Sequence, residues 1–249
     1  MSVLQKLHHK VRRAINIQRD FGTAALLQHT ISVLAGPACD FEALEILWLD
    51  AEDAALPGPL PEGMEARFLT PDEVAAFADD PENELTDSLV QRARSETDRC
   101  FGILSNGQLA SYTWYSTPEE VAADDFGLRK RVPPNAAYMH NAFTPAAWRG
   151  RRLYGIGVAS ALQQLSRQGI TSLLTDIDWS NHASRRGCRR AGFQSLGILY
   201  SFGLWRCRLS LRPHAARARQ VTFRRLGCKL TGMGMSASDE SPQTQGASA

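Results

Sequence analysis

The sequence predicts an α/β fold with a mixed sheet, and three observations support this fold class. Strand-like and helix-like segments alternate over residues 64–210. The pair Asn106-Gly107 joins two apolar strands, which is the strongest short-range signal of a β-hairpin. A helical segment at about 153–168 follows a strand at 136–144 and precedes a further strand, as in a strand–helix–strand unit.

The other elements are justified by local signals along the chain. Residues 1–35 carry apolar side chains at helical spacing, and 43–50 read as a strand. The proline-rich stretch 56–63 is a break, after which Thr70 and Pro71 begin a helix as its N-cap and first residue. Further expected elements are a strand at 64–70, a helix at 85–99, a charged loop at 117–134, a strand at 171–178, a short helix at 182–191 and hairpin-like strands at 194–210.

These elements divide the chain into three parts. Residues 1–60 form an N-terminal extension and 61–212 the main domain, while 213–249 are a basic segment followed by a Ser/Gly/Gln-rich tail that should be disordered.

The composition excludes several classes of protein. Five cysteines without a C-x-x-C pair argue against a disulfide framework or a structural zinc site, no metal is expected, and the chain suits a reducing cytoplasm. No run approaches the length of a membrane span. Twelve Arg or Lys residues and no acid lie between Trp179 and Ser238, which suggests an anionic partner for this half.

The stretch "WRGRRLYGIGVASALQQLSRQG" at 148–169 begins a helix with glycines and positive charge. Glycine in a first turn costs up to about 1 kcal/mol against alanine, so a compensating interaction is expected. An anion at the unpaired N–H groups of the helix start supplies one, and the missing Cβ atoms of Gly155 and Gly157 would let phosphate oxygens approach. The stretch is interpreted as a pyrophosphate cradle, although glycine can also simply permit close packing.

Two motifs with the expected elements between them resemble the GNAT superfamily of acyl-CoA N-acyltransferases over roughly residues 64–210. The family pattern R-x-x-G-x-G stands here as Arg152-Leu153-Tyr154-Gly155-Ile156-Gly157. The pattern N-x-x-(A/S) followed by G-F stands as Asn181, Ser184, Gly192 and Phe193. The phosphate loop begins either at Arg149 or at Arg152, because the first choice fits the helix length and the second fits the glycines.

The resemblance implies a GNAT-like fold in which the parallel strands 136–144 and 171–178 splay apart around the pantetheine arm of acetyl-CoA, the acyl donor. The acceptor would be a small-molecule primary amine, with an amino sugar as one option, attacked directly in a ternary complex. The residues expected to bind the donor are Ala142, Phe143, Thr144, Arg149, Gly150, Arg151, Arg152, Leu153, Tyr154, Gly155, Ile156, Gly157, Asn181, Ser184 and Arg185.

Catalytic candidates follow from the proton transfers that such a reaction needs. His140 is the first candidate for the base, with Tyr112 and Asp178 as water-positioning groups, although a strand histidine is often structural. In many family members a tyrosine four residues before the glycine of G-F donates a proton to the coenzyme sulfur, and here Cys188 stands at that position. The surrounding arginines should lower the pKa of Cys188, which favours solvent, Tyr154 or Tyr200 as donor.

Two other classes of function stay open at this point. One is an acyl-CoA-binding sensor without turnover, and the other is a protein that binds nucleic acid or a membrane surface through its acid-free half. Nucleic acid is the less expected partner, whereas the basic segment at 206–229 could contact an anionic surface. The oligomeric state is not predicted.

Overall fold

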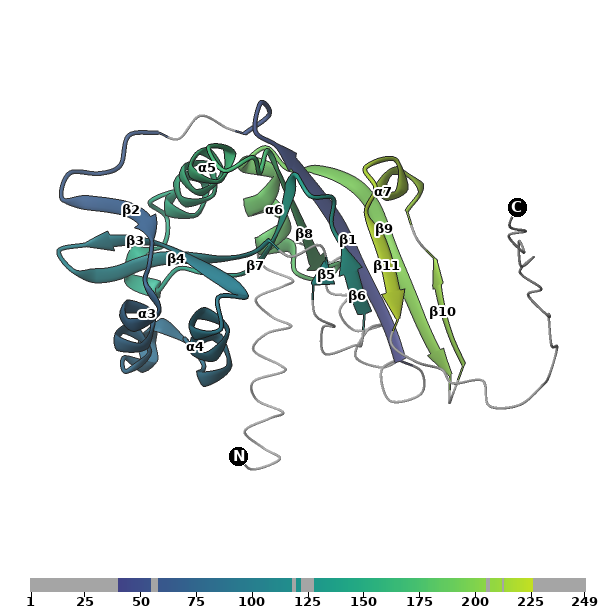
Figure 1. Cartoon of the computed structure of the whole chain (residues 1–249), viewed down its shortest axis with the longest axis horizontal. Coiled ribbons are helices and arrows are strands. Elements are labelled where there is room, and N and C mark those ends of the chain that lie inside the picture. The colour runs from purple at the N-terminus through teal and green to yellow at the C-terminus, as the bar shows by residue number, and fades with distance from the viewer. Residues whose placement is uncertain are drawn as a thin grey trace, which may run out of the picture.

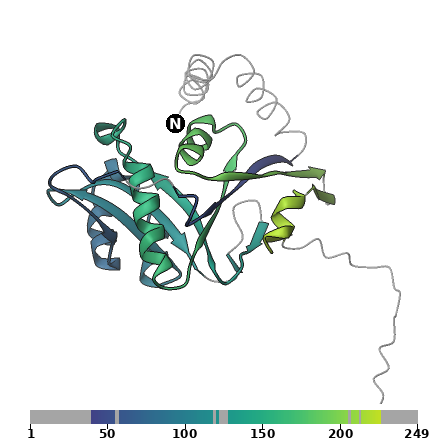
Figure 2. The same ribbon diagram turned by 90° about the horizontal axis from the view of Figure 1, so that it is seen from above.

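The structure is a computed structural model that describes residues 40–54, 58–117, 120–121, 128–204, 207–211 and 213–225 (Figure 1). It contains a large mixed sheet, a small second sheet, and helices on both faces of the large sheet (Figures 1 and 2). The predicted α/β class with a mixed sheet is confirmed. The expected helix at 1–35 and the tail beyond residue 225 lie outside the described residues.

The large sheet has eight strands in the order β10–β9–β1–β8–β7–β4–β3–β2. Its strands are β1 (Asp40–Asp50), β2 (Met64–Phe68), β3 (Asp98–Ser105), β4 (Gln108–Ser116), β7 (Ala136–Phe143), β8 (Ser172–Asp178), β9 (Gln194–Leu204) and β10 (Cys207–Leu211). The small sheet has the order β11–β6–β5, with β5 (Glu120–Val121), β6 (Leu128–Arg131) and β11 (Thr222–Arg225). Parts of the expected charged loop at 117–134 therefore belong to a sheet.

Strand β1 lies in the middle of the large sheet, where it pairs antiparallel with both β8 and β9. Its residues Ile46, Leu47 and Leu49 are completely buried because helices or the small sheet cover both faces. The sheet thus begins at residue 40, ahead of the domain start predicted near residue 61. The proline-rich break is a connection within the domain, and the strand before it belongs to the core.

The helices lie on opposite faces of the large sheet (Figures 1 and 2). The helical elements are α3 (Pro71–Ala78), η1 (Pro81–Asn83), α4 (Asp87–Arg94), η2 (Ala146–Trp148), α5 (Leu153–Ser166), α6 (His182–Arg190) and α7 (His214–Ala218). Helices α5 and α6 share one apolar core with β7 and β8, whereas α3 and α4 share another with β3 and β4. No helix in the described ranges has the length and apolar character needed to cross a membrane.

Local chemistry explains the best-predicted elements. The Thr70 hydroxyl accepts a hydrogen bond from the N–H of Glu73, and the Glu73 carboxylate accepts one from the N–H of Thr70, which is a complete capping box for α3. Between β3 and β4, Asn106 and Gly107 have φ values of 49° and 79°, as a tight two-residue hairpin requires.

The two parallel strands of the sheet separate soon after they begin. Strand β7 pairs with β8 only over 136–138 and 172–174, although β7 continues to Phe143 and β8 to Asp178. The peptide groups beyond these pairs face a gap between the strands. This geometry agrees with the splayed strands that the family resemblance implied.

Candidate active site

A cavity of about 720 Å³ occupies the gap between β7 and β8. Its walls come from the second half of both strands, from Tyr154 near the start of α5, and from one side of α6. On β7 these wall residues run without interruption from Tyr138 to Thr144, and on β8 from Thr175 to Asp178. The cavity therefore reaches backbone groups of both strands where they lack their mutual ladder bonds.

A bulge in β7 shapes one wall of this cavity. The register between β4 and β7 shifts between the pairs Tyr112–Phe143 and Trp114–His140, so β7 carries an extra residue there. Asn141 adopts a left-handed conformation with a φ of 43°, which asparagine tolerates better than most residues. Bulges of this kind often lie beside active sites because they redirect the backbone and the side chains.

A loop of basic residues leads from β7 into helix α5. Helix α5 begins at Leu153, and Arg152 precedes it as an N-cap residue with a φ of 60°. Gly150 also has a positive φ, of 80°, so the turn lies at 149–152 and ends where the helix begins. Arg149 lines the cavity and donates a hydrogen bond from Nε to the carbonyl of Thr144 at 3.0 Å, which ties the loop to β7.

The two glycines of the motif lie in the first two turns of α5. Gly157 is buried, and a Cβ atom added to it would lie 3.5 Å from Cδ1 of Ile103 on β3. Gly155 has open space around its Cα atom. A Cβ atom would make only an ordinary van der Waals contact at Gly157 and none at Gly155, so close packing does not require glycine at either position. The turn at 149–152 and the first residues of α5 carry the N–H groups that are available at the helix start.

Tyr154 and Cys188 meet on the α5–α6 side of the cavity. The Tyr154 hydroxyl lies 3.0 Å from Sγ of Cys188, and its ring packs against Gly187, which has no side chain to displace it. Burial raises the pKa of the Cys188 thiol to about 11, and burial together with the adjacent thiol raises the pKa of Tyr154. The expectation that arginines would lower the pKa of Cys188 is wrong, because the thiol points toward the core while Arg185 points toward Glu45.

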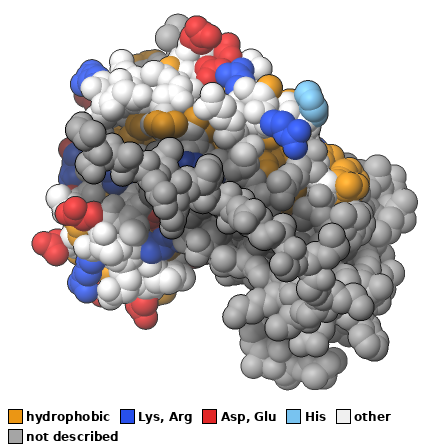
Figure 3. All heavy atoms as spheres, turned by 45° about the vertical axis from the view of Figure 1, so that its right-hand side comes forward, with side chains coloured by type: hydrophobic (Ala, Val, Ile, Leu, Met, Phe, Trp, Pro, Cys, Tyr) orange, Lys and Arg blue, Asp and Glu red, His pale blue; other side chains and the backbone are white. Residues whose placement is uncertain are grey.

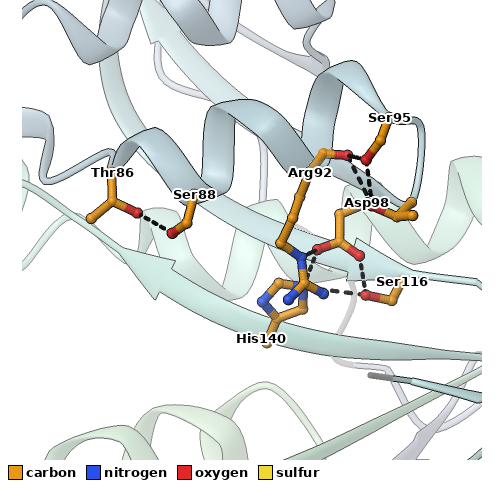
Figure 4. A network of polar contacts seen from close by, with 8 residues as sticks. Thr86, Ser88, Arg92, Ser95, Asp98, Ser116 and His140 are labelled. Carbon is orange, nitrogen blue, oxygen red and sulfur yellow. Dashed lines mark hydrogen bonds and ion pairs between the residues drawn. The ribbon is translucent and has the colours of Figure 1, made fainter. Parts of the chain in front are cut away.

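His140 lines the cavity from β7 and belongs to a cluster of polar side chains (Figure 4). Its Nε2 atom lies 3.1 Å from Oδ2 of Asp98 and 3.3 Å from Oγ of Ser116. The Asp98 carboxylate also accepts hydrogen bonds from Arg92 and from Ser116. Burial alone would raise the pKa of Asp98, but the hydrogen bonds from His140, Arg92 and Ser116 lower it to about 2.

A second buried ion pair lies beside this cluster. Lys130, on β6 of the small sheet, places its ammonium 2.7 Å from Oδ1 of Asp176 and 2.8 Å from the hydroxyl of Tyr138. The Tyr138 hydroxyl in turn donates to Oδ1 of Asp176 at 2.8 Å. Burial alone would lower the pKa of Lys130, but Asp176 and Tyr138 raise it, so the ammonium stays charged. The Tyr138 ring stacks on His140 with centroids 5.7 Å apart.

Three other predicted residues have clear structural partners. Tyr112 is buried among α3, α4 and β4, and its hydroxyl donates to the carbonyl of Asn83 at 2.9 Å, away from the cavity. Arg185 forms an ion pair with buried Glu45 and donates to the carbonyl of Trp179. Asn181 caps α6 by accepting a hydrogen bond from the N–H of Ser184 at 3.2 Å.

The structure brings half of the predicted residues together around the cavity. Those that line it are His140, Ala142, Phe143, Thr144, Arg149, Tyr154, Asn181, Ser184 and Cys188. Those outside its walls are Tyr112, Gly150, Arg151, Arg152, Leu153, Gly155, Ile156, Gly157 and Arg185.

Four functional candidates were missed by sequence reasoning: Arg92, Asp98, Ser116 and Lys130. Arg92 and Asp98 fall in the segment expected to be one helix to residue 99, whereas α4 ends at Arg94 and β3 begins at Asp98. Lys130 lies in the expected charged loop. The one available signal is Asp98 itself, an acid at the entry to a strand with an apolar centre.

Comparisons with known proteins give structural similarity at low sequence identity. No family model matches the chain, and no curated protein matches it. A GCN5-related N-acetyltransferase from Kribbella flavida is 16% identical with a TM-score of 0.48, covering 70% of this chain and 62% of that protein. A GCN5-related N-acetyltransferase from Sphaerobacter thermophilus is 16% identical with a TM-score of 0.47, covering 74% and 56%. A tandem GNAT protein of the clavulanic acid biosynthesis pathway is 19% identical with a TM-score of 0.47, covering 70% and 57%.

The chain spans between 56% and 62% of the length of these three structures. Its own geometry carries the assignment of fold: parallel strands that separate after three paired residues, a cavity between them, and a helix α5 that follows β7 and η2 and begins at a basic turn. The chain has a GNAT-like fold.

Proposed function

We propose that this chain transfers an acyl group, with acetyl as the first candidate, from acyl-CoA to a primary amine. The observation that supports this most is the cavity between β7 and β8, where backbone N–H and C=O groups lack strand partners. The pantetheine arm of coenzyme A is an extended chain with two amides, so it can bond to such groups as a missing strand would.

The start of α5 suits the phosphates of the donor. The first N–H groups of a helix have no partners within the helix, and the helix dipole favours an anion there. Arg151 and Arg152 are exposed at this end of α5, and the first turn carries no acidic residue. Charge and hydrogen-bond donors thus favour a pyrophosphate next to the turn at 149–152.

The reaction needs one group that accepts a proton and one that supplies a proton. The amine nitrogen attacks the thioester carbonyl carbon, a C–N bond forms, and the C–S bond breaks. His140 accepts the proton that the amine nitrogen loses, and the departing thiolate takes a proton from the Tyr154 hydroxyl. Solvent can replace this hydroxyl as the proton donor. A backbone N–H at the bulge in β7 polarises the carbonyl as negative charge develops on its oxygen.

The acceptor is a small primary amine in this proposal, and amino sugars come first among the compounds to test. A reducing cytoplasm is the proposed location. Cys100 and Cys188, the described cysteines whose side chains are resolved, are buried free thiols, which suits such a location.

Two measurements on the purified protein test the proposal. Acetyl-CoA at 100 times its dissociation constant should add about 2.7 kcal/mol to the free energy of unfolding and raise the melting temperature. Free-thiol release should then appear with at least one member of a panel of amino sugars, amino acids and small amines. No thermal shift would reject donor binding, and a shift without release on any amine would favour the acyl-CoA-binding sensor.

A charge-reversal pair tests the placement of the phosphates. Arg151→Glu together with Arg152→Glu should weaken acetyl-CoA binding at least tenfold, because two cations are lost beside the anion. Arg167→Glu changes an exposed arginine at the other end of α5 and should leave binding unchanged. Equal weakening by both changes would show a general charge effect and would contradict the placement.

Contact of the basic segment at 206–229 with an anionic surface is a separate proposal. Half of this segment's side chains lie outside the described residues. Arg219 forms an ion pair with Asp50, and acidic and basic side chains are interspersed on the face seen in Figure 3. Binding to anionic liposomes that weakens with salt would support the proposal, and salt-independent behaviour would remove it.

A further inference from the structure

The cluster around His140 joins three consecutive elements of the chain to a later strand. Arg92 comes from α4, Asp98 from β3, Ser116 from β4 and His140 from β7 (Figure 4). The Asp98 side chain is 1% exposed and the His140 side chain 11%. A buried carboxylate is costly unless it is paired, and three donors surround this one. Such a built arrangement holds the imidazole ring in one orientation.

The hydrogen bonds also determine where the imidazole carries its proton. The Ser116 hydroxyl has a single proton, and it donates that proton to Oδ1 of Asp98. Toward His140, Ser116 can therefore only accept, and the Asp98 carboxylate can only accept as well. Both neighbours of Nε2 are acceptors, so neutral His140 carries its proton on Nε2 and has its lone pair on Nδ1.

Other side chains also pack against the His140 ring or lie next to it. Trp114 of β4 stacks with the His140 ring with centroids 6.4 Å apart, and Tyr138 stacks with it at 5.7 Å. Tyr138 donates its hydroxyl proton to Asp176, whose charge Lys130 balances. Among the described residues packed against the ring, Asp98 and its partner Arg92 are the charged groups in direct contact with the cluster.

We infer that Asp98, held by Arg92 and Ser116, is a positioning residue. It keeps the proton of neutral His140 on Nε2, so Nδ1 is the atom that takes the proton from the acceptor amine. The inference rests on the proposed acyl transfer for its catalytic part. The carboxylate also stabilises the imidazolium that forms when the proton arrives, because the new positive charge lies 3.1 Å from Asp98. Asp98 itself stays ionised throughout.

The tautomer can be measured without any substrate. Long-range proton–nitrogen NMR spectra of the full chain labelled with ¹⁵N distinguish the two neutral forms, and the loss of signals in His140→Gln assigns those of His140. At a pH at which the His140 imidazole is neutral, we expect the form with the proton on Nε2. A proton on Nδ1, or an even mixture of the two forms, would overturn the inference.

Removal of the charge tests the catalytic part. In Asp98→Asn the imidazolium loses its ionic partner, so kcat at pH 7 should fall at least tenfold and the midpoint of the pH–rate profile should move to lower pH by about one unit. The matched control is Glu73→Gln, which removes a carboxylate paired with Arg67 outside the cavity and should change neither quantity. An unchanged midpoint in Asp98→Asn would contradict the inference.

A milder variant covers the case in which Asp98→Asn does not fold. Ser116→Ala keeps the carboxylate, so Nε2 of His140 should still carry the proton, and a switch to Nδ1 would show that Asp98 is not the anchor. The outcomes also separate this inference from the proposed function. Without thiol release by the parent protein acyl transfer is rejected, whereas the tautomer in the parent protein still decides what Asp98 does.

Discussion

Two groups of titratable side chains next to the cavity between β7 and β8 are held in opposite protonation states. On the α5–α6 side, Tyr154 and Cys188 lie 3.0 Å apart in apolar surroundings, and burial raises the pKa of both groups, so both keep their protons. Next to His140, which lines the cavity from β7, Asp98 is also buried, but three donors keep it ionised. Burial is common to both sides, and the supply of hydrogen-bond donors makes the difference.

This contrast indicates how one cavity can serve two proton transfers. Environments that push the protonation of neighbouring groups apart are a general way to assign acid and base roles. Here the protonated pair lies in the cavity wall formed by α5 and α6, whereas the ionised carboxylate lies outside the wall and contacts His140, which lines the cavity from β7. The following predictions, in order of decreasing effect, test the two sides separately.

The largest expected effect comes from an ion pair that supports the His140 side without exchanging protons. Lys130→Met leaves the Asp176 carboxylate buried without its cation, so the free energy of unfolding should fall by about 3–5 kcal/mol. Urea denaturation measures this change. Since Lys130 lies outside the His140 cluster, the midpoint of the pH–rate profile of the folded variant should be unchanged. A shifted midpoint would show that the Lys130–Asp176 pair and the His140 cluster titrate together.

The next effect concerns the base. His140→Ala should lower kcat at pH 7 about 100-fold, and at least tenfold, because the amine loses its proton acceptor. The loss should be smaller at pH 9, where more of the amine is already deprotonated. Steady-state thiol release from pH 6 to 9 checks both statements. Equal activity of the variant and the parent across this range would exclude His140 and leave a chain of water molecules as the base.

The ionised Asp98 carboxylate should make the free energy of unfolding depend on pH in the acid range. The pKa of Asp98 is lowered from 3.8 to about 2 in the folded state, so its contribution to stability is complete above about pH 4 and is lost as the pH falls toward 2. The contribution is on the order of 2 kcal/mol, since one pKa unit corresponds to about 1.4 kcal/mol. Denaturation at pH 5 and pH 2.5 measures it. A folded Asp98→Asn variant should lack this part of the pH dependence.

The smallest effects belong to the protonated pair. Tyr154→Phe should lower kcat about tenfold, because solvent replaces the hydroxyl as proton donor at some cost. Cys188→Ala should retain most of the activity, because its loss leaves the Tyr154 hydroxyl in place. Thiol release at saturating substrate compares the two variants. A larger loss in Cys188→Ala than in Tyr154→Phe would exchange their roles.

The sequence predicted what local chemistry determines. The capping box at Thr70, the turn at Asn106-Gly107 and the order of elements from β7 to α6 follow from short-range rules, and the structure contains them. His140 could be selected because it is a titratable side chain on the strand that precedes the R-x-x-G-x-G motif.

The partners of His140 could not be predicted in the same way. Asp98 reaches His140 only through the registers of β3 with β4 and of β4 with β7, and the second register includes a bulge. A shift of one residue in either register would turn a side chain to the other face of the sheet. Lys130 was missed for a related reason. A basic segment is normally expected to be exposed to solvent, and the sequence does not show that Asp176 of β8 pairs with Lys130.

The position of β1 has a consequence for how the chain is made. The hydrogen bond between Asp50 and Ser172 joins residues 122 positions apart, so β1 leaves the ribosome long before β8 exists. At 5–20 residues per second, this interval lasts roughly 6–24 s. Throughout it, the apolar side chains of β1 have no neighbouring strand on either edge. The half of the sheet formed by β2, β3 and β4 can assemble during synthesis, whereas the half that forms the cavity closes only when β8 and β9 arrive on both sides of a strand that was made first.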